Sequence, residues 1–205
     1  MDVLANSYYV LRHGESRANV EHLIVSDSEN GILDSYGLTD KGKQQAQQAA
    51  THLKETLDKD WSEKYNKEMV TLVASPFSRA RETAEIIATQ LQFQVIVDPL
   101  LRERYFGRFN MTRDENYAVV WDADKQMDAM DPDWDVESVQ DTLKRALQVI
   151  HRCEQTSKGH IYVLVSHGDV LQILRTYFAG VALENHRSLP YLGNAQLECL
   201  YIAKH

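Results

Sequence analysis

The amino-acid sequence predicts one α/β domain, a three-layer α/β/α sandwich with a mainly parallel central sheet. Near-continuous apolar or β-branched runs, typical of strands covered on both faces, alternate with amphipathic helical patterns along the chain. The chain has 205 residues and shows no internal repeat and no low-complexity linker. A single domain over residues 1–205 is therefore expected.

Five short runs have the character of strands, namely residues 8–11, 71–74, 94–97, 160–166 and 197–203. Between them, apolar residues recur at helical spacing. These helical faces lie within residues 46–57, 80–91, 139–150 and 170–178. Strands separated by helices predict crossover connections, and crossover connections produce parallel strands.

Two segments lack this regular alternation. Residues 15–38 predict a long loop, and residues 103–137 predict an acidic excursion with one helix over roughly 114–128. Residues 111–141 hold ten acidic residues against two basic ones, a balance of −8 that equals the net charge of the chain. We expect most of this run to form a solvated face, and long insertions of this kind tend to shape sites.

The composition excludes several classes of protein. A net charge of −8 argues against a general nucleic-acid binder, which needs a basic face. Cys153 and Cys199 form no C-x-x-C pair, so reduced thiols are expected rather than a disulfide framework. No basic-then-apolar leader and no run near the roughly 18 apolar residues of a membrane span occur. We expect a cytoplasmic protein with no nucleic-acid or membrane partner.

Residues capable of chemistry cluster where the predicted strands end. The first strand ends in Arg12-His13-Gly14 and the fourth in Ser166-His167-Gly168. The second is followed by Ser75-Pro76, which predicts a helix N-cap and first helical position, and then by Arg79. Ligands of open parallel sheets bind outside the carboxyl ends of the strands. Both histidines and both arginines are therefore expected at one edge of the sheet.

Two guanidiniums and two imidazoles, with helix N-termini behind them, suit a phosphate group. A neutral imidazole can attack a phosphoryl group in line while the cationic groups hold its equatorial oxygens. The leaving oxygen then needs a proton donor. Glu103 follows the third strand at the same edge and is the candidate; a turn carboxylate paired with Arg102 or Arg104 is the alternative.

A catalytic metal is the less favoured interpretation. His13 and Glu15 form the first half of the zinc deaminase signature, but the P-C-x-x-C half is absent, and so is any H-E-x-x-H motif. We expect neither a metal nor a cofactor.

The sequence also resembles the histidine phosphatase superfamily, in the branch that includes cofactor-dependent phosphoglycerate mutase and the fructose-2,6-bisphosphatase domain. Its motifs occur in order between residues 8 and about 175. They are V-L-R-H-G-E-S-R-A-N ending at Asn19, L-T-x-x-G-x-x-Q-A over 38–46, S-P-x-x-R-A-x-x-T-A over 75–84, L-x-E-x-x-x-G over 101–107, and S-H-G at 166–168.

The resemblance implies the same α/β sandwich, no metal, and a role for each matched residue. His13 would be the nucleophile that becomes phosphorylated, and Glu103 would be the proton donor. The groups that would bind the phosphate are Arg12, Asn19, Arg79, His167 and the backbone N–H of Gly168.

Departures from the family patterns narrow the function. His167-Gly168 replaces the His-Asp of the acid phosphatase and phytase branch. Phe106 stands where mutases carry a substrate-contacting Tyr, and an acidic segment, which would disfavour highly anionic substrates, stands where they carry paired arginines. The leading interpretation is a phosphatase for a small phosphorylated metabolite. The open alternatives are a cofactor-dependent phosphoglycerate mutase, a phosphoprotein or phosphohistidine phosphatase, and a phosphate-binding module.

Two further features stay open at this level. Tyr105, Phe106, Tyr117 and Trp121 could line the pocket, although ordinary packing under the excursion is the favoured interpretation. The last predicted strand could be an edge that pairs with a second copy of the chain, which leaves a homodimer as an alternative.

Overall fold

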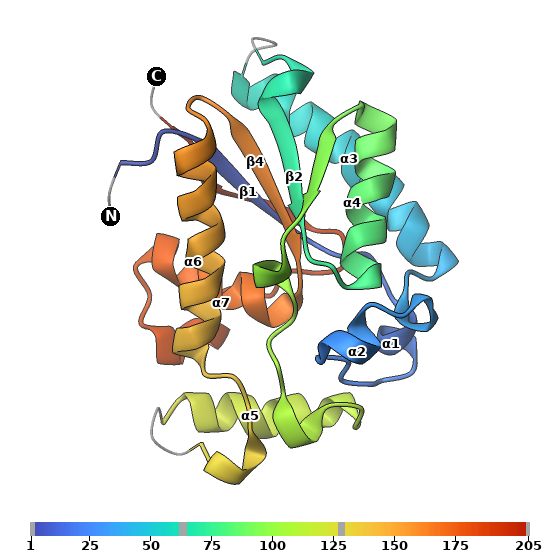
Figure 1. Cartoon of the computed structure of the whole chain (residues 1–205), viewed down its shortest axis with the longest axis vertical. Coiled ribbons are helices and arrows are strands. Elements are labelled where there is room, and N and C mark those ends of the chain that lie inside the picture. Colours follow the sequence, from blue (N-terminus) through green and yellow to red (C-terminus); the bar gives the residue numbers. More distant parts are fainter. Residues whose placement is uncertain (1–2, 62–64, 127–129, 204–205) are drawn as a thin grey trace.

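The computed structural model describes residues 3–61, 65–126 and 130–203 (Figure 1). They contain one five-stranded sheet in the order β3-β2-β4-β1-β5. The strands are β1 (Ser7–Arg12), β2 (Val70–Ala74), β3 (Gln94–Val97), β4 (Ile161–Ser166) and β5 (Leu197–Tyr201). The first four are mutually parallel, and β5 runs antiparallel to β1. The predicted mainly parallel sheet is confirmed.

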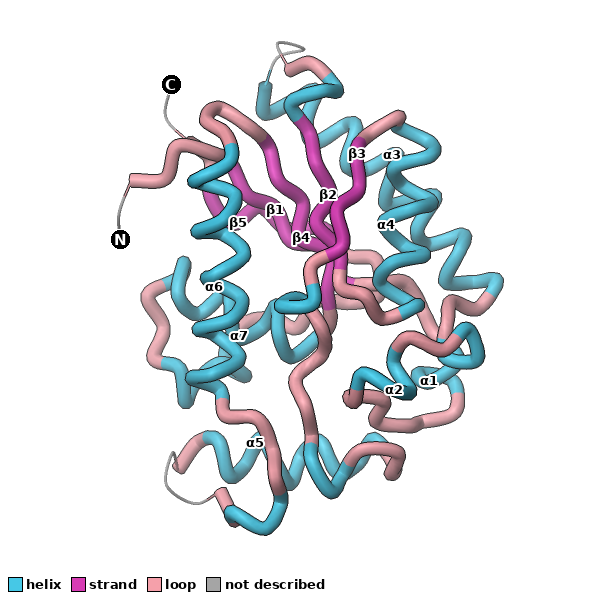
Figure 2. The backbone as a smooth tube through the Cα atoms, viewed as in Figure 1, coloured by secondary structure: helices cyan, strands magenta, loops and turns pink. Residues whose placement is uncertain are grey.

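Helices cover both faces of the sheet (Figures 1 and 2). On one face lie α3 (Asp40–Trp61) and α4 (Ser78–Leu91), and on the other lie α6 (Val139–Thr156) and α7 (Gly168–Ala179). Side chains alternate across the strands, so Tyr9 and Leu11 join the core beneath α3 and α4, whereas Tyr8 and Val10 join the core beneath α6 and α7.

The burial of each strand follows from its place in the sheet. All residues of β1, β2 and β4 are buried because helices cover both faces, which explains their continuous apolar sequences. In contrast, β3 and β5 form the two edges, and Ile96 and Val97 of β3 are 45% and 46% exposed. Pairing of the β5 edge with a second copy stays a prediction.

The predicted start of the helix after β2 is wrong. Phe77, not Ser75, occupies the N-cap of α4, and the helix begins at Ser78. The hydroxyl of Ser75 instead accepts a hydrogen bond from the N–H of Phe77 at 3.2 Å and lies 2.8 Å from Nε2 of His167. Ser75 therefore belongs to the carboxyl edge of the sheet rather than to the helix.

Two segments come together beyond the carboxyl ends of the strands, residues 15–38 and residues 103–137, and we call them the roof (Figure 1). The first contains α1 (Arg17–Val20) and α2 (Ser28–Gly31), and the second contains α5 (Tyr117–Asp124). The predicted helix over 114–128 is thus shorter, and positions 127 and 128 of that prediction lie outside the described residues. Short 3₁₀ turns cover Asp34–Tyr36, Lys67–Met69, Pro99–Leu101, Gly107–Phe109, Asp114–Asn116, Pro132–Trp134 and Leu183–Ser188.

Backbone hydrogen bonds and a small apolar cluster join the two halves of the roof. Leu23 and Arg113 form an antiparallel bridge, and the N–H of Ile24 donates to the carbonyl of Thr112 at 2.9 Å. Ile24 also packs with Phe106, Phe109 and Val120 in a cluster separate from the two main cores.

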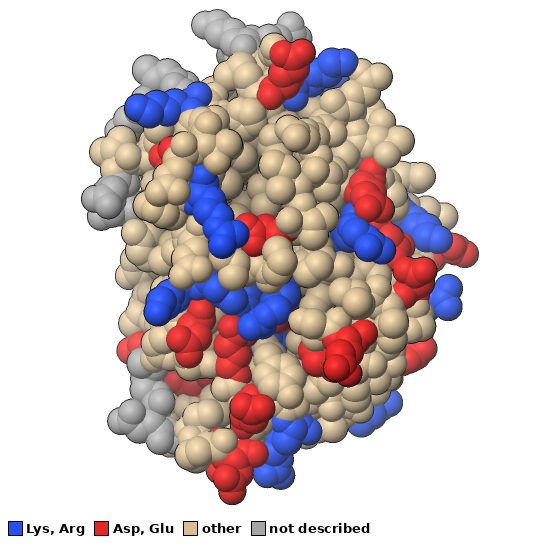
Figure 3. Space-filling model, in the orientation of Figure 1, with Lys and Arg blue, Asp and Glu red and all other residues tan. Residues whose placement is uncertain are grey.

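Most of the described acidic side chains within residues 111–141 are exposed, as expected, but Asp124 and Glu137 are exceptions. Asp124 is buried against Arg104, and Glu137 is held by Arg102 and Arg145. Burial would raise the pKa of Glu137, but its bonds to Arg145 and Arg102 lower it to about 2. Figure 3 shows acidic side chains interspersed with lysines and arginines on the viewed face.

No helix within residues 3–61, 65–126 and 130–203 combines the length and apolar character needed to cross a membrane.

Glycines allow the segment after β1 to touch the first turn of α3. A Cβ on Gly14 would lie 2.5 Å from the carbonyl oxygen of Gly42, and a Cβ on Gly42 would overlap the carbonyl oxygen of Glu15. Both obstacles are backbone atoms, which cannot move aside as a flexible side chain does.

Gly42→Ala is therefore expected to lower the free energy of unfolding by about 1–3 kcal/mol, because this overlap outweighs the roughly 1 kcal/mol by which Ala is preferred in helices. Urea denaturation measures the change. Gly193→Ala is the control, since its Cβ would meet only the side-chain oxygen of Gln196 at 3.4 Å. Equal stability of the two variants would contradict the argument.

Candidate active site

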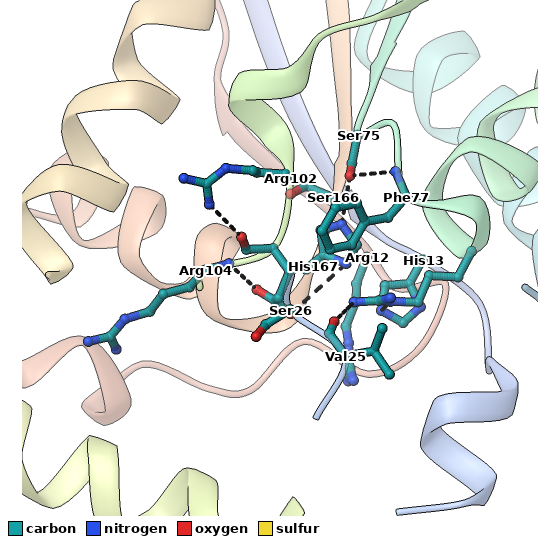
Figure 4. A network of polar contacts seen from close by, with 12 residues as sticks. Arg12, His13, Val25, Ser26, Ser75, Phe77, Arg102, Arg104, Ser166 and His167 are labelled. Atoms are coloured by element: carbon teal, nitrogen blue, oxygen red, sulfur yellow. Dashed lines mark hydrogen bonds and ion pairs between the residues drawn. The ribbon is translucent and has the colours of Figure 1, made fainter. Parts of the chain in front are cut away.

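A cavity of about 70 Å³ lies at the carboxyl edge of the sheet, against the roof. Arg12 and Ser166 are paired in the parallel register of β1 and β4, so the residues that follow them, His13 and His167, emerge side by side. Their ring centroids are 5.2 Å apart. The predicted site residues that line the cavity are Arg12, His13, Asn19, Arg79, Glu103 and Gly168. His167 is not among the lining residues, but its ring lies beside that of His13 (Figure 4).

His13 is held as a neutral imidazole. Its Nδ1 lies 2.7 Å from the carbonyl oxygen of Gly14, which requires the proton on Nδ1, and Arg79 Nε donates to its Nε2 at 3.2 Å. Burial lowers the pKa of His13 well below its usual value, and the charges of Arg79 and Arg12 lower it further. Nε2 therefore carries the lone pair, as a nucleophile requires.

The two buried guanidiniums leave donors unused at the cavity. Arg12 Nη1 donates to the carbonyl of Leu192 at 2.9 Å, and Arg79 Nη2 donates to the carbonyl of Val25 at 3.0 Å. Within the described part of the chain, Arg12 Nε and Arg79 Nη1 are buried without a hydrogen-bond partner. Buried cationic donors without partners are costly and rare, so this pair indicates a site for an anion.

His167 is fully buried, and burial lowers its pKa well below the usual value, with Arg79 adding to the effect. Its Nε2 lies 2.8 Å from Ser75 Oγ, and the Phe77 ring meets it edge-on at 5.2 Å between centroids. Its Nδ1 lies 3.9 Å from Glu103 Oε2. The sequence analysis missed the contact of Ser75 because a serine before proline also fits a helix cap.

Glu103 is 5% exposed, and burial raises its pKa to about 7 although the nearby Arg79 acts to lower it. A carboxyl group with this pKa can still hold a proton near neutral pH. The alternative of a carboxylate paired with Arg102 or Arg104 is wrong. The Glu103 carboxylate accepts a hydrogen bond from the backbone N–H of Arg104 at 2.9 Å, and Figure 4 shows both arginine side chains pointing away from the histidines.

Asn19 and Gly168 complete the predicted set. Asn19 Oδ1 accepts hydrogen bonds from the N–H and the hydroxyl of Ser16, both at 3.0 Å, and so forms the capping box of α1. Gly168 is the first residue of α7, whose N-terminus therefore faces the cavity with free N–H groups.

The roof contributes residues that the sequence analysis did not place in the site. Tyr117 and Trp121 line the cavity, and Tyr117 also packs against the roof cluster, so packing and lining hold together for Tyr117. Phe106 is buried in that cluster, and Tyr105 is not among the lining residues. The rings of Tyr117 and Trp121 stack with their centroids 5.3 Å apart, as side chains four residues apart on one helix face can do. This four-residue spacing was the feature of the sequence that could have indicated that Tyr117 and Trp121 lie on the same face of a helix. The other missed lining residues with polar groups are Asp114, Asp169 and Tyr191.

A buried ion network fixes the roof to the domain. Arg104 donates to both oxygens of Asp124 at 2.6 and 2.7 Å and to Asp169 Oδ2 at 3.2 Å. Trp121 Nε1 donates to Asp169 Oδ1 at 2.8 Å. Helix α5 is thereby tied to the start of α7, next to Glu103.

The side chains of His13 and Glu15, which form the H-x-E pair, do not come together in one site. Glu15 accepts hydrogen bonds from Lys41 at 2.7 Å and from Thr39 at 2.9 Å rather than joining His13. Across the described residues, no group of three or more His, Cys, Asp or Glu side chains is arranged to hold a metal ion.

Comparison with known proteins agrees with this geometry. The profile of the "Histidine phosphatase superfamily (branch 1)" matches residues 8–205. The chain belongs to the histidine phosphatase superfamily. A superfamily relative, "Probable phosphoglycerate mutase GpmB" of Escherichia coli, is 30% identical over 187 residues, which cover 88% of this chain and 78% of that protein.

Solved structures share the superfamily fold. YhfR of Bacillus stearothermophilus superposes with a TM-score of 0.74 at 23% identity, covering 94% of this chain and 89% of that one. A mycobacterial glucosyl-3-phosphoglycerate phosphatase in complex with VO3 gives a TM-score of 0.73 at 23% identity, covering 93% and 90%. At these identities the likeness concerns the fold alone.

Arg104→Met is expected to lower the free energy of unfolding by about 3–5 kcal/mol, because it leaves the buried carboxylates of Asp124 and Asp169 without their cation. Chemical denaturation measures the loss. Lys125→Met, which breaks the exposed pair with Asp122, serves as control and should change stability by about 0.5 kcal/mol or less. A similar small effect for both variants would show that the network does not hold the roof.

Proposed function

We propose that this protein is a metal-independent phosphatase that hydrolyses a phosphomonoester through a phosphohistidine on His13, with Glu103 as proton donor. One observation carries the proposal: unpartnered donors of Arg12 and Arg79 border the same cavity as a neutral His13 whose Nε2 bears the lone pair. Anion site and nucleophile are thus adjacent.

In the first step, Nε2 of His13 forms a bond to phosphorus while the bond between phosphorus and the leaving oxygen breaks. Glu103 gives its proton to that oxygen and becomes a carboxylate. Arg79 Nε exchanges its hydrogen bond to His13 for one to a phosphoryl oxygen, and Arg12 holds another oxygen as charge redistributes.

In the second step, the Glu103 carboxylate takes a proton from a water molecule as the water oxygen attacks phosphorus. The bond to Nε2 breaks, His13 returns to its neutral form, and inorganic phosphate is released. The hydrogen bond from Nδ1 to the carbonyl of Gly14 supports both steps, because it fixes the ring orientation and stabilises the positive charge of the phosphorylated ring.

A second candidate function is phosphoglycerate mutase activity, which the name of the Escherichia coli relative favours. The names of two solved structures, a glucosyl-3-phosphoglycerate phosphatase and a putative α-ribazole-5′-P phosphatase, favour hydrolysis. An assay that follows both phosphate release from 3-phosphoglycerate and its conversion to 2-phosphoglycerate separates the two reactions.

His13→Ala is expected to reduce hydrolysis of p-nitrophenyl phosphate by at least about 10³-fold, because it removes the nucleophile. The assay contains EDTA, and wild-type activity should survive the chelator. The control is His52→Ala, which changes an exposed histidine of α3. Turnover by His13→Ala close to the wild-type rate would remove His13 from the mechanism.

Glu103→Gln is expected to slow hydrolysis of an alkyl phosphate by about 10²–10⁴-fold and that of p-nitrophenyl phosphate far less, since p-nitrophenolate leaves without a proton. Burial raises the pKa of Glu103 to about 7, so the donor is protonated below pH 7 and loses its proton above it.

In the wild type, kcat/KM for the alkyl ester should therefore fall as pH rises above about 7, and this alkaline decline should be absent in Glu103→Gln. Equal losses with both esters, or an unchanged pH profile in the variant, would exclude Glu103 as the acid.

A further inference from the structure

The cavity has two chemically different sides. One side carries His13 and the guanidiniums of Arg12 and Arg79. The other, where a leaving group must lie, is formed by apolar and aromatic residues and by two acids. These residues include Leu23, Tyr117, Trp121, Asp114 and Asp169. Two other lining residues, Val25 and Tyr191, lie against the guanidiniums of Arg79 and Arg12. Among the described residues that line the cavity, Arg12 and Arg79 are the only arginines or lysines.

Those two cations are both needed by the phosphoryl group. A phosphomonoester carries close to two negative charges at neutral pH, which two guanidiniums balance. A carboxylate or second phosphate on the leaving group would then enter a partly buried space whose nearest further cation, Arg187, stacks on Trp121 at 3.7 Å and is already paired with Asp169 at 3.6 Å. A charge that lacks a cation of its own in such a space is disfavoured.

The two acids differ in how far their charge is already compensated. Asp169 has both oxygens engaged, Oδ1 by Trp121 at 2.8 Å and Oδ2 by Arg104 at 3.2 Å, and Arg187 lies 3.6 Å from Oδ1. Asp114 has a single side-chain contact among the described residues, 3.0 Å from Oδ2 to Nδ1 of His22. Its other oxygen, Oδ1, has no side-chain partner among the described residues. Asp114 lies where the two halves of the roof meet, because its N–H donates to the carbonyl of His22.

From this charge pattern we infer that the site, acting as the phosphatase proposed above, selects small phosphomonoesters whose leaving group is neutral or bears an ammonium, and that Asp114 determines this specificity by rejecting a second acidic group. An ammonium group finds the free oxygen of Asp114, whereas a carboxylate meets repulsion that the enclosed setting strengthens.

The size of the cavity restricts the leaving group as well. Its volume of about 70 Å³ is small beside the roughly 300–1,000 Å³ of ordinary ligand pockets. A compact leaving group therefore suits the site, and among leaving groups of similar size the charge becomes the main feature by which substrates can be distinguished.

The test uses three esters of nearly equal size that differ in charge: 2-aminoethyl phosphate, propyl phosphate and carboxymethyl phosphate. The expected kcat/KM of the wild type is highest for the ammonium or neutral ester and at least about tenfold lower for the carboxylate ester. Equal or faster hydrolysis of the carboxylate ester would overturn the inference.

Asp114→Asn should compress the ratio between the ammonium and carboxylate esters to about threefold or less. Asp122→Asn removes an exposed charge that does not line the cavity and should keep the full ratio. His22→Asn removes the partner of Asp114 but not its charge and should also keep it. A full ratio in Asp114→Asn, or the same compression in Asp122→Asn, would refute the role of Asp114.

Binding gives a readout that does not need turnover. Calorimetric titration of His13→Asn with the same esters should give the same order of affinities as the wild-type kcat/KM values. Adding Asp114→Asn to that variant should compress the affinity ratio between the ammonium and carboxylate esters. Absence of phosphate release from every ester, p-nitrophenyl phosphate included, would overturn the proposed function. Phosphate release with no charge preference, or binding with none, would overturn this inference alone.

Discussion

The parallel pairing of β1 with β4 is the constraint on which the site depends. Their register places Arg12 beside Ser166, and this single alignment puts two imidazoles 5.2 Å apart at the end of a fully buried pair of strands. A shift by one residue would turn one histidine into the opposite core. Both faces of these strands are packed against helices, so a change of register would disrupt both cores. The packing of the sheet therefore fixes the positions of the two histidines.

The electrostatics of the site form one coupled arrangement. Unpartnered guanidinium donors are unfavourable in the folded chain, and the same charges keep His13 neutral. Burial also keeps Glu103 partly protonated, so a carboxylic acid and a neutral imidazole exist together near neutral pH, as the proposed mechanism requires. An arriving phosphoryl group relieves the unpaired donors, and part of its binding free energy therefore comes from an unfavourable feature of the empty protein.

The sequence was most informative where one physical rule dominated. Continuous apolar runs predicted strands covered on both faces, and the rule for carboxyl ends placed Arg12, His13 and His167 together. The sequence was least informative where tertiary contacts determine the environment of a side chain. Whether Ser75 caps a helix or binds His167, and whether Tyr117 lines a cavity, depends on neighbours more than forty residues away. The burial of Asp124 was likewise invisible in a run of mostly exposed acids, because its partner Arg104 comes from outside that run.

The Arg104 network also means that positions in and near helix α5 differ in how readily they tolerate substitution. Asp124 and Asp169 share the buried cation of Arg104, so replacing Arg104 alone would leave both carboxylates without that partner, whereas either aspartate can change and leave an ion pair. Asp114 precedes the helix, is partly exposed, and does not belong to this buried network. With the role proposed for Asp114, new substrate preferences would arise by single substitutions near this residue, while the Arg104 network holds the other end of the helix in place.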